Sequence, residues 1–520
     1  MYFIALEHGF PMKIGLPENH GLSSNLVSGP LLRRNAAGEI ELTDIQFEAF
    51  NSGIAKGQSV LAIAPTSSGK TDIGLIAASS WLDSGINEGR KIVYLTSHRA
   101  LARQKFYEFQ DRLGPLFSLA KSEMVLATGD DVIDANGDPV PDAFSVPVVI
   151  ATYEKYLNML AGSGFRGGTD KICCIADELQ LISDSTRGQQ VEILMTLLRQ
   201  DTGQIVALSA VMEEKDAQLL AYWLNARLIR TTRREVPLIY ELRTPTQTLT
   251  TTTDRESAPA TGPARETDTL STLKELLKEP GEHEPIAVFC MSKKEVFELA
   301  EQWASEASRM GARVEDDLPL FREPTTSADE LNRYLPHRFA YHTADLNEDE
   351  RVAVEARLDG NELRVVFATT TLAAGLNYAF RTVIIHNWER WNSRKRAREP
   401  ILPGEFHNMA GRAGRLSHVD RPGRVIFFAN TATQVRLATR YLSWWELENF
   451  KARIHPSTFP QLSLQLLASG VVESDEELFD FLQGTFSAQR ELEINAAQPD
   501  VWRQALTNSL SYLKQWNFVA

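Results

Sequence analysis

The sequence predicts an α/β protein with two tandem lobes, each built on a parallel sheet, followed by a mainly helical C-terminal region. Two runs of short apolar segments alternate with amphipathic helical patterns, as in parallel sheets covered by helices. A stretch rich in threonine, proline and alanine separates the two runs, and strand patterns fade after the second one. At 520 residues, the chain is also too long for a single hydrophobic core.

These patterns divide the chain into five parts. Residues 1–40 lack clear periodicity and are interpreted as an N-terminal extension. The first lobe covers residues 41–242, and the second covers residues 270–430. Residues 243–269 contain almost no large apolar side chains, which predicts a flexible linker or an exposed loop. Helical periodicity dominates residues 431–520.

Each lobe contains short apolar runs that are expected to be buried strands. In the first lobe these runs are residues 60–64, 91–96, 146–152, 171–176 and 204–208. In the second lobe they are residues 285–290, 339–342, 363–368, 382–386 and 423–429. Amphipathic segments separate most of these runs, which favours parallel strands joined by helices.

The composition excludes several classes of protein. No run of about 18 apolar residues occurs, so no segment is expected to span a membrane. The first residues lack the basic and apolar parts of a signal peptide, and three cysteines are too few for a disulfide framework or a four-ligand zinc site. We therefore expect a cytoplasmic protein with reduced thiols. A net charge of −14 argues against a protein that coats DNA, but not against a motor with a basic groove.

The most specific motif is Ala-Pro-Thr-Ser-Ser-Gly-Lys-Thr at residues 64–71. It follows a predicted strand and precedes a helical pattern, which is where a phosphate-binding loop lies. Lys70 would supply a cation to the β- and γ-phosphates of ATP, and the Thr71 hydroxyl would bind Mg²⁺. The backbone N–H groups expected to surround the phosphates belong to Thr66, Ser67, Ser68 and Gly69. The alternative, a chance Gly-Lys-Thr in a loop, is disfavoured by the adjoining strand and helix.

Two carboxylates directly follow the predicted strand at residues 171–176. Asp177 is predicted to bind Mg²⁺, and Glu178 to orient or deprotonate the attacking water. An isolated Asp-Glu pair after a strand is usually a solvated strand end. Its place on a later strand of the same predicted sheet as the phosphate-binding loop favours the catalytic interpretation.

The second lobe contains Asn-Met-Ala-Gly-Arg-Ala-Gly-Arg at residues 408–415. Two arginines three positions apart on a helical turn share one face and can point at the same anion. Arg412 and Arg415 are therefore candidate arginine fingers for the charge of the transition state. For one of the two, a glycine-rich loop that binds phosphate without catalysis remains an alternative.

Together and in this order, the motifs resemble those of superfamily 2 DExH helicases, and within them the Ski-like group with its HelQ-type DNA-repair branch. The resemblance runs from about residue 42 to residue 429. It implies two RecA-like domains that hydrolyse ATP at their interface, a winged-helix-like C-terminal region, and 3′ to 5′ movement along single-stranded or partly duplex DNA. A Ski-type RNA helicase shares nearly every motif and remains an alternative. The family's ratchet domain is not recognised in the given sequence, so we expect it to be absent, supplied by a protein partner, or removed by truncation of the chain.

The resemblance also assigns residues to the nucleotide. Residues 42–46 match the Q-motif, in which Gln46 would contact the adenine. Residues 368–377 are similar to motif V, and Gly375 and Asn377 would lie near the nucleotide.

Two departures from the family concern the coupling of hydrolysis to strand binding. The family's Asp-Glu-x-His is here Asp-Glu-Leu-Gln, so Gln180 can form hydrogen bonds across the lobes but cannot titrate. Asn408 stands where glutamine is usual. We expect a live ATPase with altered coupling. The alternative is a nucleotide-binding scaffold that serves a nuclease partner.

Further motifs of the family imply contacts to the phosphate backbone of a single strand. Hydroxyls and backbone N–H groups suit this task because they hold phosphates without reading bases. The implied residues are Arg99, Thr128, Gly129, Thr152 and Thr370. Taken singly, each threonine would more often be a helix cap or a strand surface residue. Their ordered set favours the functional interpretation.

Residues 388–400 lie where the HelQ-type branch has a β-hairpin that wedges duplex ends. Aromatic side chains can stack on an unpaired base while cations hold the backbone. The residues predicted for this wedge are Trp388, Trp391, Arg394 and Arg396. A solvated basic loop with one tryptophan packed in the core is the alternative. Such a motor would suit DNA repair or defence against foreign DNA.

Overall fold

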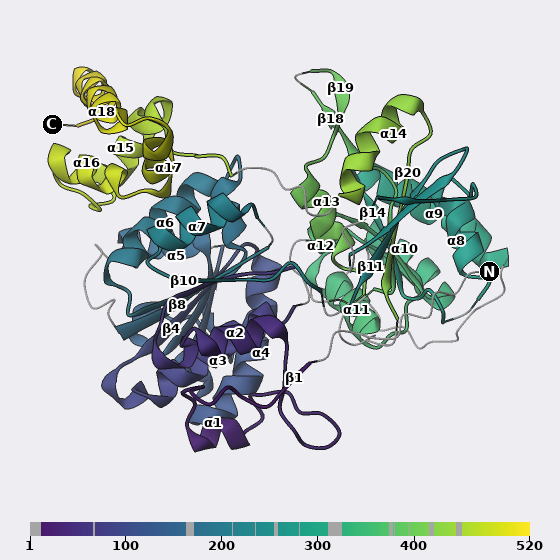
Figure 1. Ribbon diagram of the computed structural model, residues 1–520, viewed down its shortest axis with the longest axis horizontal. Helices are drawn as coiled ribbons and strands as arrows, with labels where there is room; N and C mark the ends of the chain where they lie inside the picture. The colour runs from purple at the N-terminus through teal and green to yellow at the C-terminus, as the bar shows by residue number, and fades with distance from the viewer. Residues whose placement is uncertain are drawn as a thin grey trace. The chain divides into compact units, whose positions relative to one another are not determined.

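The computed structural model describes residues 12–65, 68–129, 131–162, 171–210, 212–234, 236–253, 258–279, 281–309, 325–373, 378, 380–393, 395–414, 421–443 and 450–519. The chain forms two compact units (Figure 1). The first unit comprises Met12–Ala64, Gly69–Thr231 and Asn449–Ala520, and the second comprises chiefly Thr232–Glu448. Each unit contains an eight-stranded, mostly parallel sheet, which confirms the predicted α/β fold with two lobes.

The sheet of the first unit has the strand order β10-β3-β9-β8-β4-β7-β5-β6. Neighbouring strands are parallel except for β5 and β6. The strands are β3 (Val60–Ile63), β4 (Lys91–Thr96), β5 (Met124–Thr128), β6 (Asp131–Asp134), β7 (Val148–Thr152), β8 (Ile172–Ala176), β9 (Gln204–Ser209) and β10 (Arg227–Arg230). All five predicted runs are confirmed to within two residues, whereas β5, β6 and β10 lie outside them.

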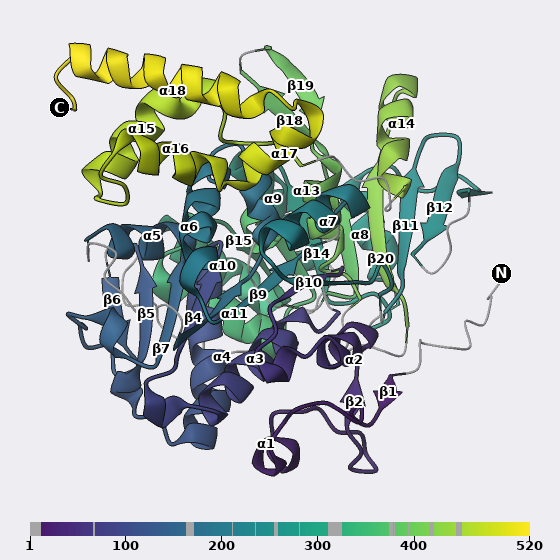
Figure 2. The same ribbon diagram turned by 60° about the vertical axis from the view of Figure 1, so that its left-hand side comes forward.

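Helices cover both faces of this sheet, so its central strands are buried on either side (Figure 2). They are α2 (Asp44–Asn51), α3 (Lys70–Asp83), α4 (Arg99–Phe117), α5 (Tyr153–Gly162), α6 (Gly188–Asp201) and α7 (Glu214–Trp223). Helix α2 begins with a capping box in which Thr43 and Gln46 satisfy each other's backbone N–H groups.

The predicted N-terminal extension packs onto the first unit along its described part. Strand β1 (Lys13–Ile14) pairs with β2 (Glu41–Leu42), and α1 (Ser24–Ser28) lies between them in sequence. Leu22, Leu26 and Leu31 are buried in the core of this unit. The segment is therefore part of the fold of the first unit. Its leucines reach the core but are not regularly spaced, which is why the sequence shows no periodicity.

The sheet of the second unit has the order β13-β12-β11-β20-β17-β14-β16-β15. The six strands β11, β20, β17, β14, β16 and β15 are parallel to their neighbours among these six. At the other end of the sheet, β12 pairs in antiparallel fashion with β11 and with β13. The strands are β11 (Leu238–Arg243), β12 (Thr248–Thr252), β13 (Ala260–Gly262), β14 (Ile286–Cys290), β15 (Phe339–His342), β16 (Val365–Thr369), β17 (Thr382–Ile385) and β20 (Gly423–Phe428). The five runs predicted for this lobe are confirmed.

The helices of the second unit surround this sheet, and a small hairpin extends from it. The helices are α8 (Thr269–Leu276), α9 (Lys293–Arg309), α10 (Thr326–Tyr334), α11 (Glu348–Asp359), α12 (Thr370–Ala373), α13 (Pro403–Ala410) and α14 (Ala432–Ala438). The hairpin consists of β18 (Glu389–Asn392) and β19 (Ala397–Pro400), which pair in antiparallel fashion.

The structure contradicts the predicted linker at residues 243–269. Strands β12 and β13 lie within it and continue the second sheet, and β11, placed at the end of the first lobe by the sequence, belongs to the same sheet. Threonines suit strands because they are branched at Cβ, and Thr248 and Thr251 are buried there. The polar composition therefore marks a sheet edge, and the chain passes between the units at Thr231 and Thr232.

The predicted helical character of the C-terminal region is confirmed. It contains α15 (Phe459–Ala468), α16 (Asp475–Gln483), α17 (Phe486–Ile494) and α18 (Gln498–Gln515). Within residues 450–519 the structure has no strand that could form the wing of a winged helix. These helices lie over α5, α6 and α7 in both ribbon views and share one core with the first unit, which includes Trp502 and Leu462 (Figures 1 and 2).

The joint between the C-terminal helices and the first unit is both polar and apolar. Trp223 Nε1 donates to Gly484 O (2.8 Å), and the Trp223 ring contacts Phe486 with centroids 5.6 Å apart. The buried Glu192 carboxylate accepts from the backbone N–H (2.6 Å) and the hydroxyl (2.8 Å) of Ser487. Residues 449–520 thus belong to the compact unit of the first lobe, although the sequence suggests a separate domain. None of the described helices combines the length and apolarity needed to cross a membrane.

Candidate active site

The phosphate-binding loop lies at the carboxyl end of β3 and runs into α3. Gly69 has φ 83° and forms the N-cap of α3, which begins at Lys70. A Cβ at Gly69 would lie 2.4 Å from Gln46 Nε2, so only glycine fits this left-handed position. Lys70 Nζ donates to Ala64 O (2.6 Å), which folds the ammonium back over the loop. The positive end of α3 and this ammonium together suit an anion.

Ser68 closes the described part of the loop. It is buried, and its hydroxyl donates to Pro65 O (2.9 Å). Thr66 and Ser67, which the sequence assigns to the same loop, lie outside the described residues.

Gln46 braces the loop from the side of α2. Its Oε1 accepts from Thr43 N (3.0 Å), and its Nε2 donates to Gly69 O (3.1 Å) and to Asp72 Oδ2 (3.1 Å). Both ends of the amide are therefore engaged within the protein, although the resemblance implies a contact with adenine. A nucleotide contact would require Gln46 to exchange one of these partners.

Asp177 follows β8 and is buried at the carboxyl edge of the sheet. Its Oδ2 accepts from the Tyr94 hydroxyl (2.6 Å), and its Oδ1 accepts from Glu178 N (2.9 Å). Burial raises the pKa of the Asp177 carboxyl and the charge of Glu178 adds to the rise, whereas Lys105, Tyr94 and Lys70 lower that pKa. The aspartate is thus fixed in place and surrounded by cations.

Glu178 has a left-handed backbone with φ 57°, which costs a residue with a side chain roughly 1–2 kcal/mol. Its carboxylate accepts from Gln180 Nε2. Gln180 Oε1 in turn accepts from Ser209 Oγ (3.0 Å) and Ala210 N (3.0 Å) at the end of β9. The Gln180 amide therefore links the carboxylate pair to the neighbouring strand within the first unit, while the sequence suggests bonds across the lobes.

Sequence reasoning missed Lys105. This residue of α4 is only 4% exposed, and its Nζ donates to Thr71 Oγ1 (3.2 Å) and to Glu108 Oε2 (2.8 Å). It shares the buried face of α4 with Leu101 and Phe109. A lysine on the apolar face of an amphipathic helix is the signal that could have found it, since buried charges require partners.

The residues predicted to bind a metal fit Mg²⁺ chemically. Thr71 offers a hydroxyl and Asp177 a carboxylate, which are the hard oxygen ligands that this ion prefers. The ammonium of Lys105 donates to the Thr71 hydroxyl, and its charge lowers the pKa of the Asp177 carboxyl. One buried lysine therefore acts on both predicted ligands.

In the second unit, the short loop after α13 carries Arg412. Arg412 is buried, its O accepts from Phe380 N (3.1 Å), and its N donates to Met409 O (3.1 Å). Arg415, Gly375 and Asn377, which the sequence assigns to ATP binding and catalysis, lie outside the described residues.

The residues implied for a nucleic-acid backbone in the first unit meet at one sheet edge. Thr128 ends β5 and Thr152 ends β7, two neighbouring parallel strands. Arg99 begins α4, and its guanidinium covers Gly129, where a Cβ would lie 2.5 Å from Arg99 Cζ. Thr152 Oγ1 accepts from Lys155 N (3.4 Å), so it also caps α5. Carboxyl ends of parallel strands commonly hold ligands.

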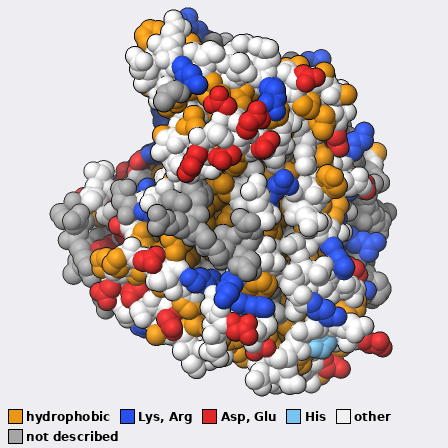
Figure 3. Space-filling view, turned by 90° about the vertical axis from the view of Figure 1, so that its left-hand side faces the viewer, with side chains coloured by type: hydrophobic (Ala, Val, Ile, Leu, Met, Phe, Trp, Pro, Cys, Tyr) orange, Lys and Arg blue, Asp and Glu red, His pale blue; other side chains and the backbone are white. Residues whose placement is uncertain are grey.

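Arg187 is a further residue at this edge that sequence reasoning missed. Its Nε and Nη2 donate to the two oxygens of Glu154 (2.6 and 2.9 Å), and Nη2 also donates to Ser97 O. The bidentate pair neutralises the carboxylate next to the implied backbone contacts. On the face shown in Figure 3, acidic and basic side chains both occur, and neither kind covers the surface.

Comparison with known protein families shows to which family the chain belongs. Residues 43–220 match the model of the DEAD/DEAH box helicase family, and residues 268–417 match the helicase conserved C-terminal domain. The chain belongs to the superfamily 2 helicases.

Its relatives include proteins described as ATP-dependent DNA helicase Hel308. The chain is 31% identical to that of Pyrococcus horikoshii over 464 residues, which cover 87% of this chain and 59% of the relative. It is 31% identical to that of Pyrococcus abyssi over 458 residues, covering 86% and 59%. For Thermoplasma volcanium the identity is 29% over 486 residues, covering 92% and 65%. The chain thus spans about three-fifths of the length of the curated relatives it matches.

In the second unit of the chain, Thr370 begins α12 directly after β16. It therefore lies at the carboxyl edge of the second sheet, the position at which Thr128 and Thr152 lie in the first sheet. This placement agrees with the implied backbone contact.

The two tryptophans predicted for the wedge differ in exposure at the hairpin β18–β19. Trp391 is 60% exposed on β18, whereas Trp388 is 2% exposed and donates from Nε1 to Phe428 O (2.7 Å). Trp388 also contacts the Tyr441 ring, with centroids 5.7 Å apart. The prediction that Trp388 stacks on a base is therefore wrong, because its ring and its N–H are used in the core.

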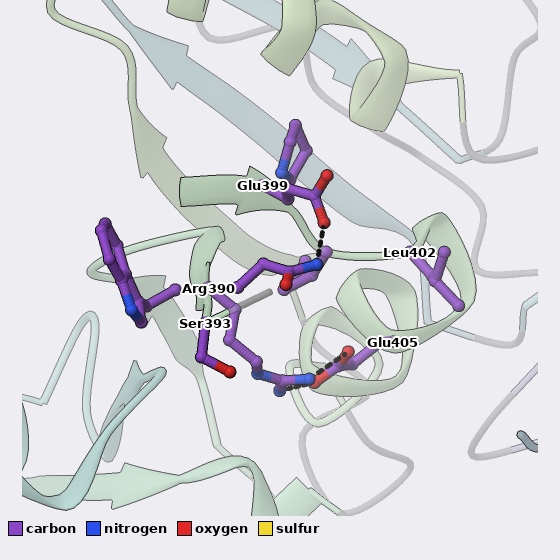
Figure 4. Close-up of a pocket in the computed structure, with 9 residues that line it drawn as sticks. Arg390, Ser393, Glu399, Leu402 and Glu405 are labelled. Atoms are coloured by element: carbon purple, nitrogen blue, oxygen red, sulfur yellow. Dashed lines mark hydrogen bonds and ion pairs between the residues drawn. The ribbon is translucent and has the colours of Figure 1, made fainter. Parts of the chain in front are cut away.

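An ion pair joins the hairpin to α13 beside a cavity of about 480 Å³ (Figure 4). Arg390 pairs with Glu405, and Asn392 Nδ2 donates to Glu399 Oε2 (2.6 Å). Arg396 has φ 49° in the turn and is exposed. Arg394, also predicted for the wedge, lies outside the described residues. The described part of the hairpin thus presents one exposed tryptophan and basic side chains.

Proposed function

We propose that this chain is an ATP-hydrolysing helicase or translocase that acts on single-stranded or partly duplex DNA. The observation that carries the proposal is the cluster of Lys70, Thr71, Asp177 and Lys105 at the carboxyl edge of the first sheet. Two cations and a fixed carboxylate beside a helix N-terminus are the groups that a nucleotide phosphate and its metal require.

The residues of the site have different roles in this proposal. Lys70 and the start of α3 bind the phosphates, and Glu178 orients the attacking water. Thr71 and Asp177 would hold Mg²⁺, which supplies positive charge next to the phosphates when bound. Arg412, and Arg415 by the same argument, stabilise negative charge that develops on the transferred phosphoryl group.

Strand binding in the first unit is assigned to Arg99, Thr128, Gly129 and Thr152, and in the second unit to Thr370. Hydroxyls and one guanidinium at sheet edges suit phosphates of any sequence. DNA is favoured over RNA because the relatives are described as DNA helicases. From the family resemblance we infer 3′ to 5′ polarity.

We further expect the helicase to act in the cytoplasm. A protein partner that supplies a nuclease or the function of the ratchet domain would complete its activity.

The test is steady-state ATP hydrolysis with and without single-stranded DNA or RNA homopolymers. DNA should stimulate hydrolysis more than RNA does, and Lys70→Ala should abolish it. Lys121→Ala, which changes an exposed lysine of the same unit, is the matched control and should hydrolyse ATP at the wild-type rate. A Lys70→Ala variant that remains active would refute the site. Stimulation by RNA alone would instead identify an RNA helicase, and hydrolysis that neither polymer changes would indicate a scaffold subunit.

Polarity is tested separately on partial duplexes. Displacement of a strand from substrates with a 3′ single-stranded tail, but not from those with a 5′ tail, is the expected result.

A further inference from the structure

The segment that follows the passage between the units carries a buried arginine, Arg234. It belongs to the second unit, is 7% exposed, and precedes β11. Burial lowers the pKa of its guanidinium to about 10, so the group remains charged at neutral pH. A buried charge requires partners that repay its loss of water.

The loop that carries Arg412 offers three backbone carbonyls to Arg234. Nη2 donates to Ala413 O (3.1 Å), Gly411 O (3.4 Å) and Gly414 O (3.4 Å). Nε donates to Val236 O (3.3 Å), which anchors the guanidinium to its own segment. The carbonyls on both sides of Arg412 thus accept from one side chain.

The location favours a cation. Gly411 is the C-cap of α13, and the carbonyls after a helix C-terminus carry partial negative charge. The planar guanidinium directs Nη2 at the loop carbonyls and Nε at Val236 O, so one side chain holds both segments.

The same loop is held tightly by its backbone. Phe380 N donates to Arg412 O (3.1 Å), and Gly414 N donates to Phe380 O (2.9 Å). Gly414 has φ 59°, and a Cβ there would lie 2.8 Å from the backbone of Gly423. The loop therefore lies close to both β20 and Phe380, and Arg234 adds hydrogen bonds to its carbonyls.

We infer that Arg234 is a positioning residue for Arg412: its guanidinium fixes the backbone on both sides of that arginine and ties the loop to the segment that joins the two units. The part of this inference that concerns catalysis rests on the proposed function, because it takes Arg412 to act on the phosphoryl group. The part that concerns the loop does not.

Replacement of Arg234 should therefore lower ATP turnover and leave ATP binding nearly unchanged. Arg234→Lys keeps the charge but loses the planar set of donors, so the loop should loosen while the rest of the unit stays folded. We expect kcat for ATP to fall about tenfold and KM to stay within about twofold, since the phosphate-binding loop is untouched.

The matched control is Arg243→Lys. Arg243 is also a buried arginine of the second unit, but it pairs with Glu275 and Glu241 away from this loop. Its replacement should lower the melting temperature without lowering kcat. An equal loss of kcat in both variants would show a general effect of burial and would overturn the inference.

A double-mutant cycle separates positioning from independent effects. In the Arg412→Ala background, Arg234→Lys should cause no further loss of kcat, because the residue through which it acts is gone. A loss that multiplies with that of Arg412→Ala would overturn the inference.

Hydrogen exchange gives a readout that does not depend on catalysis. In Arg234→Lys the amides of Phe380 and Gly414 should exchange at least about tenfold faster, whereas amides in α9 should be unchanged. Unchanged exchange at Phe380 and Gly414 would overturn the inference whatever the activity. If Arg412→Ala hydrolyses ATP normally, the proposed role of Arg412 fails, and hydrogen exchange alone then decides whether Arg234 holds the loop.

Discussion

The ammonium of Lys105 lies 3.2 Å from the hydroxyl of Thr71, although the two residues belong to different helices and are 34 positions apart. Lys105 also pairs with Glu108 and lowers the pKa of the nearby Asp177 carboxyl. One buried cation thus contacts or influences both groups that are expected to hold Mg²⁺. The site is therefore charged before any nucleotide arrives.

Lys105→Met should weaken the site at low pH. Without the cation the pKa of Asp177, already raised by burial, rises further, and the carboxylate is protonated at a higher pH. We expect the acid limb of the kcat/KM profile to move to higher pH. At low pH the half-saturating Mg²⁺ concentration should increase at least about threefold, because a protonated Asp177 no longer offers a charged ligand to the ion.

A fluorescent nucleotide titrated with Mg²⁺ at several pH values measures this effect. Lys121→Met, a change of an exposed lysine, is the control and should leave both quantities unchanged. If Lys105→Met has the wild-type pH profile and Mg²⁺ dependence, Lys105 has no electrostatic role in the site.

Gln180→Ala should impair turnover rather than ATP binding. Its amide joins the Glu178 carboxylate to Ser209 and Ala210, so its loss frees the carboxylate while Lys70 is unaffected. A hydrogen bond contributes about 0.5–1.5 kcal/mol, which predicts a roughly two- to tenfold fall in kcat with KM nearly unchanged.

The Ser209→Ala variant tests the path of this effect. Combined with Gln180→Ala, it should add nothing, because the two side chains share one hydrogen bond. Independent losses in the double variant would mean that Gln180 does not act through β9.

Features formed by residues that are contiguous in the chain could be predicted from the sequence. The strands at residues 60–63 and 172–176 are unbroken apolar runs, and the loop ending in Lys70 and Thr71 is a local motif. The places of Asp177 and Glu178 could also be predicted, because both residues come directly after a strand.

The remaining features depend on neighbours that are distant in sequence. The sequence can mark Lys105 as a lysine on an apolar helix face, but its place in the site depends on α4 packing beside Thr71. Arg234 is recognisable only once the loop at residues 411–414 lies against it. The threonines of β12 resembled a loop because the run is polar, although in the fold it pairs with β11 and β13 near the edge of the sheet. Trp388 and Trp391 are equivalent in the sequence, and only the fold buries the first and exposes the second.

Trp391→Ala should reduce strand separation without impairing ATP hydrolysis on single strands. Its ring is exposed on the hairpin, where it can stack on a base, and it makes no contribution to the buried core. Loss of one stacking contact corresponds to about 1–3 kcal/mol, so we expect at least about a fivefold slower displacement of a duplex strand.

Trp388→Ala provides the contrast. Removal of this buried ring should destabilise the second unit by about 3–5 kcal/mol and lower every activity together. If Trp391→Ala separates strands at the wild-type rate, the hairpin does not act through this tryptophan.

Glu192 should make the attachment of the C-terminal helices depend on pH. The buried carboxylate accepts two hydrogen bonds from Ser487, yet burial raises its pKa from the usual 4.5 to about 7. The folded protein therefore keeps this proton up to a pH near 7, whereas the unfolded chain releases it near 4.5. Folding takes up a proton between these values, so this contribution to stability is complete below pH 4.5 and is lost as the pH rises through 7.

Glu192→Gln should remove this dependence because the amide stays neutral and can still accept from Ser487 N. Relative to the wild type, the variant should gain up to roughly 3 kcal/mol in the free energy of unfolding between pH 5 and pH 8. Urea unfolding at these two pH values, followed by tryptophan fluorescence, measures the difference. Glu493→Gln, an exposed change on α17, should show no such gain. A wild type and a Glu192→Gln variant with parallel pH dependence would mean that Glu192 is ionised throughout this range, and the joint would then owe its stability to Trp223, Phe486 and the shared apolar core.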